Sequence, residues 1–222
     1  VAGKCRPREF LAALAAFARF GHARETLAAH AADFRGDAVR ALLAAVPDVA
    51  ALAAGLRAQF VAGDDGSFTP TPGTDAAYDD AEAAVHAAEA RLEEERKAAA
   101  ATLKLALRDV PWKHVGTNEI YQLEVPARTA VPAPWIVMSQ TKAAKRYYTP
   151  RGKELVRLLK EARETRLAAV RAFQDTVYAQ FRAENATFAR AVRTVAQLDA
   201  LLHFLVGEIA VSTDHRLGVR TG

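Results

Sequence analysis

The feature that most constrains the fold is a change of hydrophobic period that occurs twice along the chain. From Asp75 onward, apolar residues recur every seven positions, which is typical of a long helix packed against one neighbour. Near Thr102 the pattern changes to the alternation of a β-strand, and at Thr149 it returns to helical spacing. We therefore expect two long antiparallel helices that bracket a β insertion.

The first long helix is predicted over residues 75–101, with Thr74 or Asp75 as its N-cap. A rise of 1.5 Å per residue gives it a length of about 40 Å. Its apolar stripe is narrow and made of small residues: Tyr78, Ala81, Val85, Ala88, Leu92 and Ala99. The chain contains 51 alanines, and alanine has the lowest helix cost, so the composition also favours helix.

The second long helix is predicted to begin at Pro150, which suits the first helical position, with Thr149 as its cap. Asn185 marks a kink or break, and a further apolar helix follows. The stripe before that break consists of Leu155, Leu159, Ala162, Val170, Phe173, Val177 and Phe181.

Residues 8–62 predict packed short helices. We expect Gly21 and Gly36 to act as stops, and Pro47 to lie in the first turn of a helix that continues to Phe60.

Residues 63–74 have the composition of a loop, where Asp64 and Asp65 favour a turn over an ion site. The single cysteine, Cys5, excludes an internal disulfide and a thiolate cluster for zinc. The six histidines never fall three or four apart on one helix face. We expect no metal site, and we expect no catalytic residues because no nucleophile, base and orienting group occur together.

The insertion predicts a small antiparallel sheet. Strands are expected at residues 112–115, 119–125, 135–141 and 145–148, with a tight hairpin after the first. The predicted fold class is mainly α with a small β insertion. The chain then divides into incoming helices (1–101), a β module (102–148) and returning helices (149–222).

The formal charge of +4 conceals an asymmetry. Residues 33–100 carry 13 acids against 6 bases, whereas residues 110–166 carry 11 bases against 5 acids. A basic segment within a near-neutral chain indicates contact with a polyanion. Charge alone leaves open the alternative of an ordinary solvated helix face.

Several motifs resemble the MutS mismatch-repair family. The stretch WKHVGTNEIYQLEVP at residues 112–126 is similar to the clamp hairpin of that family, and SQTKAAKRYYTP at residues 139–150 is similar to the clamp exit. Leu-Asp-Ala-Leu-Leu at residues 198–202 resembles a motif near the end of the family's lever. Residues 69–80 resemble the eukaryotic MutS homologue 6 type.

The resemblance implies a DNA-backbone site on the β module. Lys142, Lys145 and Arg146 can pair with phosphates, and Thr117 and Asn118 at the hairpin tip can donate neutral hydrogen bonds to them. Trp112 and Trp135, with at least one of the tyrosines at 147 and 148, are expected in the module core, and His114 as an ordinary strand residue. We expect the cations of the returning helix to form a solvated, mutually repelling face: Arg151, Lys153, Arg157, Lys160 and Arg163.

The resemblance also implies a lever and clamp segment. This segment would grip duplex DNA non-specifically through its backbone and relay DNA binding to a distant ATPase domain. ATP and Mg would then bind elsewhere in the full-length protein, since no G-x-x-x-x-G-K-[ST] loop occurs here and we expect no cofactor in this segment. The implied partners are duplex DNA and a second MutS homologue of the homologue 2 type, in the nucleus. The segment itself is not expected to be an enzyme.

An alternative is a structural coiled-coil arm whose basic tip docks a protein. No stretch of about 20 uninterrupted apolar residues occurs, so no membrane span is expected. The chain opens on Val1 without a signal-like segment, and we expect it to be part of something longer.

Overall fold

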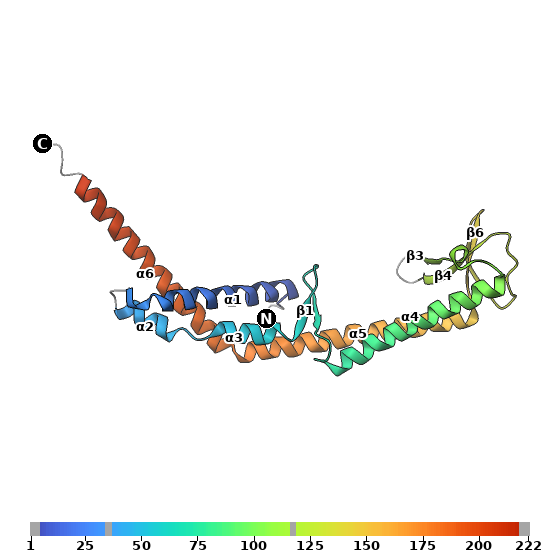
Figure 1. The fold of residues 1–222 in the computed structure, drawn as a ribbon, viewed down its shortest axis with the longest axis horizontal. Coiled ribbons are helices and arrows are strands. Elements are labelled where there is room, and N and C mark those ends of the chain that lie inside the picture. Colours follow the sequence, from blue (N-terminus) through green and yellow to red (C-terminus); the bar gives the residue numbers. More distant parts are fainter. Residues whose placement is uncertain (1–4, 34–36, 116–118, 218–222) are drawn as a thin grey trace. The chain divides into compact units, whose positions relative to one another are not determined.

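The computed structural model describes residues 5–33, 37–115 and 119–217, and it confirms the predicted fold class (Figure 1). The chain forms two compact units. The first unit comprises residues 1–71 and 174–222, and the second comprises residues 72–173.

The described residues form long helices and short antiparallel strands. The helices are α1 (Pro7–Ala29), α2 (Asp37–Ala45), α3 (Val49–Arg57), α4 (Ala76–Leu103), α5 (Pro150–Ala183) and α6 (Asn185–Leu217), with the 3₁₀ helices η1 (Ala31–Asp33) and η2 (Leu107–Asp109). The strands are β1 (Phe60–Ala62), β2 (Phe68–Pro70), β3 (Trp112–Val115), β4 (Glu119–Pro126), β5 (Ile136–Gln140) and β6 (Ala144–Tyr148). Helix α5 contributes to both units, and its residues up to Phe173 belong to the second.

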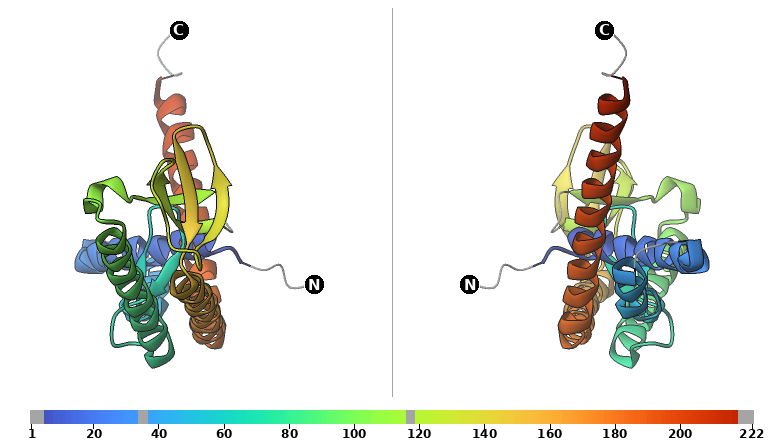
Figure 2. Two further views of the ribbon diagram at one scale, coloured as in Figure 1. Left: turned by 90° about the vertical axis from the view of Figure 1, so that its right-hand side faces the viewer. Right: turned by 90° about the vertical axis from the view of Figure 1, so that its left-hand side faces the viewer.

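In the second unit, α4 and the first part of α5 form the expected antiparallel pair, called here the arm (Figures 1 and 2). The seven-residue stripe of α4 faces inward, where Val85 and Leu92 are buried. They pack against Leu155 and Leu159 of α5. The narrow stripe predicted from the sequence is therefore the core of the arm.

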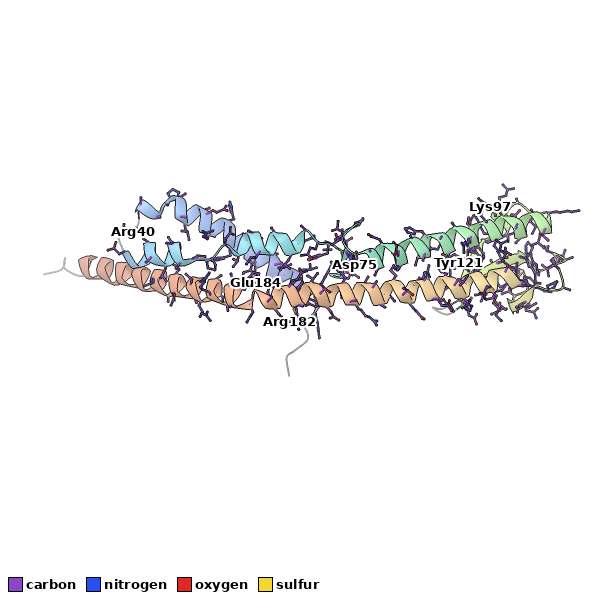
Figure 3. All side chains as sticks on the ribbon, turned by 90° about the horizontal axis from the view of Figure 1, so that it is seen from below. Arg40, Asp75, Lys97, Tyr121, Arg182 and Glu184 are labelled. Atoms are coloured by element: carbon purple, nitrogen blue, oxygen red, sulfur yellow. The ribbon has the colours of Figure 1, made fainter. Side chains whose placement is uncertain are left out.

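The ends of these helices follow their sequence signals. The carboxylate of Asp75, at the start of α4 (Figure 3), accepts a hydrogen bond from the backbone N–H of Tyr78 at 2.8 Å. The hydroxyl of Thr149 accepts one from the N–H of Gly152 at 2.7 Å. Both predicted caps are confirmed, and so is the break near Asn185, where α6 begins.

The β insertion, called here the module, is a four-stranded sheet in the order β3-β4-β6-β5, and every neighbouring pair is antiparallel. All four predicted strands are present. The module shares its cores with the arm: Ile120 and Tyr148 join the cluster around Leu92, whereas Leu123 and Tyr147 pack with Ala99. Burial of these side chains therefore fixes the sheet on the end of the arm.

The first unit is built around aromatic side chains. The ring of Phe10 on α1 contacts Tyr178 and Phe181 edge-on, at centroid distances of 5.0 and 5.4 Å. Phe60 and Phe68 lie 4.5 Å apart and complete the cluster. Such pairs stabilise a core beyond the area that they bury.

Two predictions for this unit were wrong. Phe60 lies on β1 rather than on the helix from Pro47, and β2 lies within residues 63–74, which were expected to be loop. Strands β1 and β2 form a hairpin because Asp65 and Gly66 supply its turn. The Asp65 carboxylate accepts from the backbone of Ser67 at 2.9 Å, and Gly66 adopts a φ of +81°. The predicted turn at Asp64 and Asp65 is confirmed.

Gly21 was expected to stop a helix, but it lies inside α1. It is buried against α3, and a Cβ placed there would lie 2.1 Å from Cβ of Ala50. The absence of a side chain allows the two helices to approach closely, so this glycine serves packing rather than termination. Gly36, the other predicted stop, lies outside the described residues.

The stretch of residues 39–57 is long and apolar enough to be a candidate membrane span. No membrane span was expected from the sequence. This stretch is not one continuous helix, because α2 ends at Ala45 and α3 begins at Val49. Several of its apolar residues, including Leu43 and Leu56, are buried in the first unit. Length and composition alone are weak support for a span.

Candidate nucleic-acid interface

Three of the predicted phosphate-binding residues lie together at the β5–β6 connection of the module. Lys142 is exposed in the turn between these strands, and Lys145 and Arg146 follow it on β6. The turn is fixed because the Thr141 hydroxyl accepts from the N–H of Ala144 at 3.0 Å and donates to its carbonyl. Among the described residues, neither lysine makes an ion pair.

Arg146 differs from the two lysines because its charge is already engaged. Its Nε donates to Glu124 on β4 at 3.0 Å, and its Nη1 donates to the Ser139 hydroxyl at 3.4 Å. Only 25% of the Arg146 side chain is exposed. Lys113 Nζ also lies 3.9 Å from Glu124, so one carboxylate holds two cations of the module.

The other two predicted residues, Thr117 and Asn118, lie outside the described residues. Strand β3 ends at Val115 and β4 begins at Glu119, and these two residues are register partners. The predicted hairpin pairing of β3 with β4 is confirmed on the described strands, whereas the role of its tip stays a prediction.

The prediction of a mutually repelling face on α5 was wrong for Arg151, Arg157 and Arg163. Arg151 lies 3.6 Å from Glu95 of α4. Arg163 donates to Glu89 of α4 at 2.7 Å, and Arg166 donates to Glu82 at 2.9 Å. Arg157 pairs with Glu154 and Glu161 of its own helix. Several acids of α4 are therefore paired with cations of α5 within the arm. In the part of the chain that the structure describes, Lys142 and Lys145 at the β5–β6 connection have no acidic partner.

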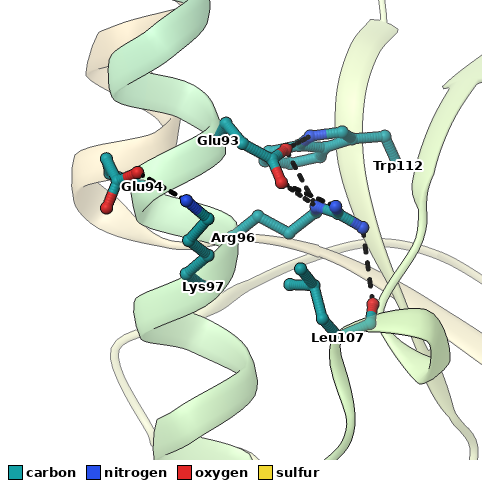
Figure 4. A network of polar contacts seen from close by, with 6 residues as sticks. All are labelled: Glu93, Glu94, Arg96, Lys97, Leu107 and Trp112. Carbon is teal, nitrogen blue, oxygen red and sulfur yellow. Dashed lines mark hydrogen bonds and ion pairs between the residues drawn. The ribbon is translucent and has the colours of Figure 1, made fainter.

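A polar network holds the start of the module on α4 (Figure 4). The Arg96 guanidinium donates to the Glu93 carboxylate, at 2.6 Å from Nη2, and reaches the Leu107 carbonyl at 3.4 Å. The indole N–H of Trp112 donates to the same carboxylate at 3.4 Å. The hydrogen bond from Arg96 lowers the pKa of Glu93 below its ordinary value, and the lowering exceeds the opposing effect of burial.

The aromatic residues singled out from the sequence belong to the core. Tyr147 and Tyr148 are both buried, and Trp112 and Trp135 pack against the same clusters. The Tyr148 hydroxyl donates to the Ile120 carbonyl at 2.5 Å. Burial, followed by the nearby Glu119 charge, raises the pKa of Tyr148. These rings are therefore unavailable as stacking platforms for bases.

Sequence reasoning missed Tyr121 and its neighbours. Tyr121 has a φ of +55° although it lies within β4, and its backbone N–H donates to Nδ1 of His114 at 3.3 Å. The sequence does not predict the positive φ of Tyr121, because glycine or asparagine is the usual residue in that conformation. His114 is thus more than the ordinary strand residue expected.

Within the described part of the chain, no group of three or more His, Cys, Asp or Glu side chains is placed to hold a metal ion. A depression of about 390 Å³ lies between the module and α5, and its lining mixes apolar residues with both charges. That lining includes Tyr148, Met138, Lys153 and Glu154.

Comparison with known proteins is informative for the second unit. Residues 73–165 match MutS family domain IV. The MutS match covers α4, the whole module and the first part of α5.

The chain is also similar to DNA mismatch repair protein msh3 from Aspergillus oryzae, with 38% identity over 81 residues. That stretch is 35% of this chain and 7% of the fungal protein, so the chain corresponds to a small part of that relative. Both matches support the MutS family, and neither confirms the homologue 6 type.

Proposed function

We propose that the chain is the lever and clamp segment of a mismatch-repair MutS homologue, and that its module grips the backbone of duplex DNA without reading sequence. The match of residues 73–165 to MutS family domain IV carries this proposal. The distribution of charge supports it, because the arm is internally paired whereas Lys142 and Lys145 face no acidic partner among the described residues.

The grip is electrostatic and mechanical rather than catalytic. A lysine at a fixed turn neutralises a phosphate and releases its condensed counterions, which gives affinity that is independent of base sequence. The packing of Tyr148 and Ile120 against α4 and α5 gives a rigid route along which such binding would be relayed through the arm.

The wider proposal concerns the full-length protein. The ATPase domain, with its ATP and Mg, would lie outside this segment, because the phosphate loop is missing from residues 1–222. The partner would be a second MutS homologue of the homologue 2 type, and the compartment the nucleus. The resemblance of residues 69–80 favours the homologue 6 type. The division of the chain into incoming helices (1–101), a β module (102–148) and returning helices (149–222) is also part of the proposal.

Salt-dependent binding to a duplex of random sequence tests the DNA grip. Fluorescence anisotropy at several salt concentrations should give a linear relation between log K and log salt. The Lys142→Ala/Lys145→Ala variant should flatten its slope by about 1.8 if both lysines contact phosphate. The matched control is Lys97→Ala/Arg157→Ala, which removes the same charge from paired positions on the arm (Lys97 is labelled in Figure 3) and should leave the slope unchanged.

The alternative function, a coiled-coil arm that docks a protein, is favoured by one observation. Edge strand β5 exposes Ile136 and Val137, at 39% and 56%. Absence of duplex binding at low salt would contradict the DNA grip and leave this alternative. A tenfold preference for a G·T mispair over a matched duplex would contradict the sequence-blind mode of binding.

A further inference from the structure

Strand β4 of the module departs from regular β geometry at one place. Lys113 pairs with Gln122 and Val115 pairs with Glu119, so three steps along β4 match two steps along β3. The extra residue makes a β-bulge, and Tyr121 within it has a φ of +55°. A bulge bends its strand and increases the local twist, so this one sets the direction of the β3–β4 hairpin.

A bulky residue at positive φ persists only where its surroundings hold it. The Tyr121 ring meets Trp112 edge-on at 5.3 Å and His114 at 4.9 Å. His114 also accepts the N–H that the bulge frees from the β-ladder. These contacts with Trp112 and His114 hold the bulge to β3, the other strand of its hairpin.

A contact with Arg163 ties the same ring to the arm. The Arg163 guanidinium carbon lies 5.9 Å from the centroid of the Tyr121 ring, within the range of a cation–π interaction. Arg163 is also held by Glu89 of α4 at 2.7 Å. The guanidinium of Arg163 on α5 therefore contacts both α4 and the bulge. Tyr121 is labelled in Figure 3.

We propose that Glu89, Arg163 and Tyr121 form a joint that fixes the direction of the β3–β4 hairpin on the arm. Arg163 is then a positioning residue that aims the hairpin tip, not a phosphate contact. This role rests on the proposed DNA grip, because the hairpin tip is one of the two places where that grip is expected.

The first test measures direction without DNA. Spin labels at Val115→Cys on β3 and Ala90→Cys on α4, in a Cys5→Ser background, report the distance between hairpin and arm by double electron–electron resonance. Both labelled positions are exposed. The unmodified joint should give a narrow distribution, and Arg163→Gln should give a broader, displaced one.

Matched variants separate the joint from general destabilisation. Tyr121→Leu removes the ring at similar volume and should reproduce the effect of Arg163→Gln. Tyr121→Phe keeps the ring and should behave like the wild type. Arg157→Gln removes an arginine of the same helix whose ion pairs among the described residues lie within α5, and it should leave the distribution unchanged. Helical circular dichroism should be alike in all variants.

The second test uses duplex DNA. The sequence prediction gives Thr117 and Asn118 to DNA phosphates as neutral hydrogen-bond donors. Under that prediction a misdirected hairpin loses hydrogen bonds but releases the same number of counterions. Arg163→Gln should therefore weaken binding by about two- to tenfold, the size of a lost neutral hydrogen bond, with an unchanged slope of log K against log salt.

The outcomes are distinct. An unchanged label distance in Arg163→Gln, or an equal change in Arg157→Gln, overturns the joint. If Arg163→Gln flattens the slope of log K against log salt by about 0.9, this residue contacts phosphate and its positioning role is overturned. If the wild type binds no duplex, the proposed DNA grip fails, and the label distances alone decide whether the joint exists.

Discussion

The Nε of Arg146 lies 3.0 Å from Oε2 of Glu124, its register partner on the neighbouring strand. This cross-strand ion pair engages one of the three cations expected to hold phosphate. Because Lys113 lies 3.9 Å from the same carboxylate, Glu124 restrains two positive charges on one sheet. If the module binds DNA as proposed, Glu124 would limit its affinity by competing with phosphate for these two cations.

Replacement of Glu124 by glutamine should strengthen duplex binding. The change keeps the size of the side chain but frees the charges of Arg146 and Lys113, which can then neutralise phosphates. The slope of log K against log salt should steepen by up to about 1.8. Glu94→Gln, which releases only Lys97 on the outer face of α4, is the control. An unchanged slope in Glu124→Gln would show that neither cation reaches DNA.

Arg96→Met should destabilise the second unit by about 1–3 kcal/mol, because it leaves the Glu93 carboxylate and the Leu107 carbonyl without their shared donor. Urea unfolding measures the loss. Lys97→Met at the next position breaks an exposed pair with Glu94 and should cost much less, because exposed ion pairs contribute little to stability. Equal losses in the two variants would contradict the structural role of the network in Figure 4.

The same network predicts a dependence on pH. Arg96 lowers the pKa of folded Glu93 below its ordinary value of 4.5, so Glu93 contributes stability above that value. The contribution is lost as the pH falls through the lowered pKa. Arg96→Met should therefore lose less stability than the wild type between about pH 5 and pH 3. Parallel acid dependence in both proteins would contradict this assignment.

The helices and strands of the second unit could be predicted because their signals are local. The caps Asp75 and Thr149 each accept a backbone N–H three residues later, so the short sequence contains the whole interaction. The alternation in residues 119–125 likewise predicts a strand, although it does not show that Ile120 and Leu123 belong to two different hydrophobic clusters. Gly21 was misjudged for the opposite reason, since its neighbour Ala50 lies on another helix.

The candidate site was only partly predictable. The sequence shows that Lys142, Lys145 and Arg146 are clustered, but it cannot show that Glu124 faces Arg146 from 22 positions away. The pairing of Arg166 with Glu82 spans 84 positions and depends on the register of two helices. Composition alone made the basic segment look unpaired, and only the packing of α4 on α5 reveals its partners.

Two tyrosines with opposite hydroxyl environments give a matched pair of stability tests. The Tyr178 hydroxyl is buried and has no hydrogen-bond partner among the described residues. Tyr178→Phe should leave the free energy of unfolding unchanged or raise it by about 1 kcal/mol, since an unpaired buried hydroxyl is costly. Tyr148→Phe removes the bond to Ile120 and should lower it by about 1 kcal/mol. A loss in Tyr178→Phe as large as in Tyr148→Phe would indicate a partner for that hydroxyl.

Two glycines in helices of the first unit should respond in opposite directions to alanine. In a helix interior, glycine to alanine is usually stabilising by about 0.5–1 kcal/mol. At Gly55 of α3 a Cβ would have no neighbour within 4 Å, so Gly55→Ala should show this gain. At Gly21 the Cβ would lie 2.1 Å from that of Ala50, and overpacking of this kind costs about 1–3 kcal/mol. Gly21→Ala should therefore lower the thermal unfolding temperature, and a gain at both positions would contradict the close approach of α1 to α3.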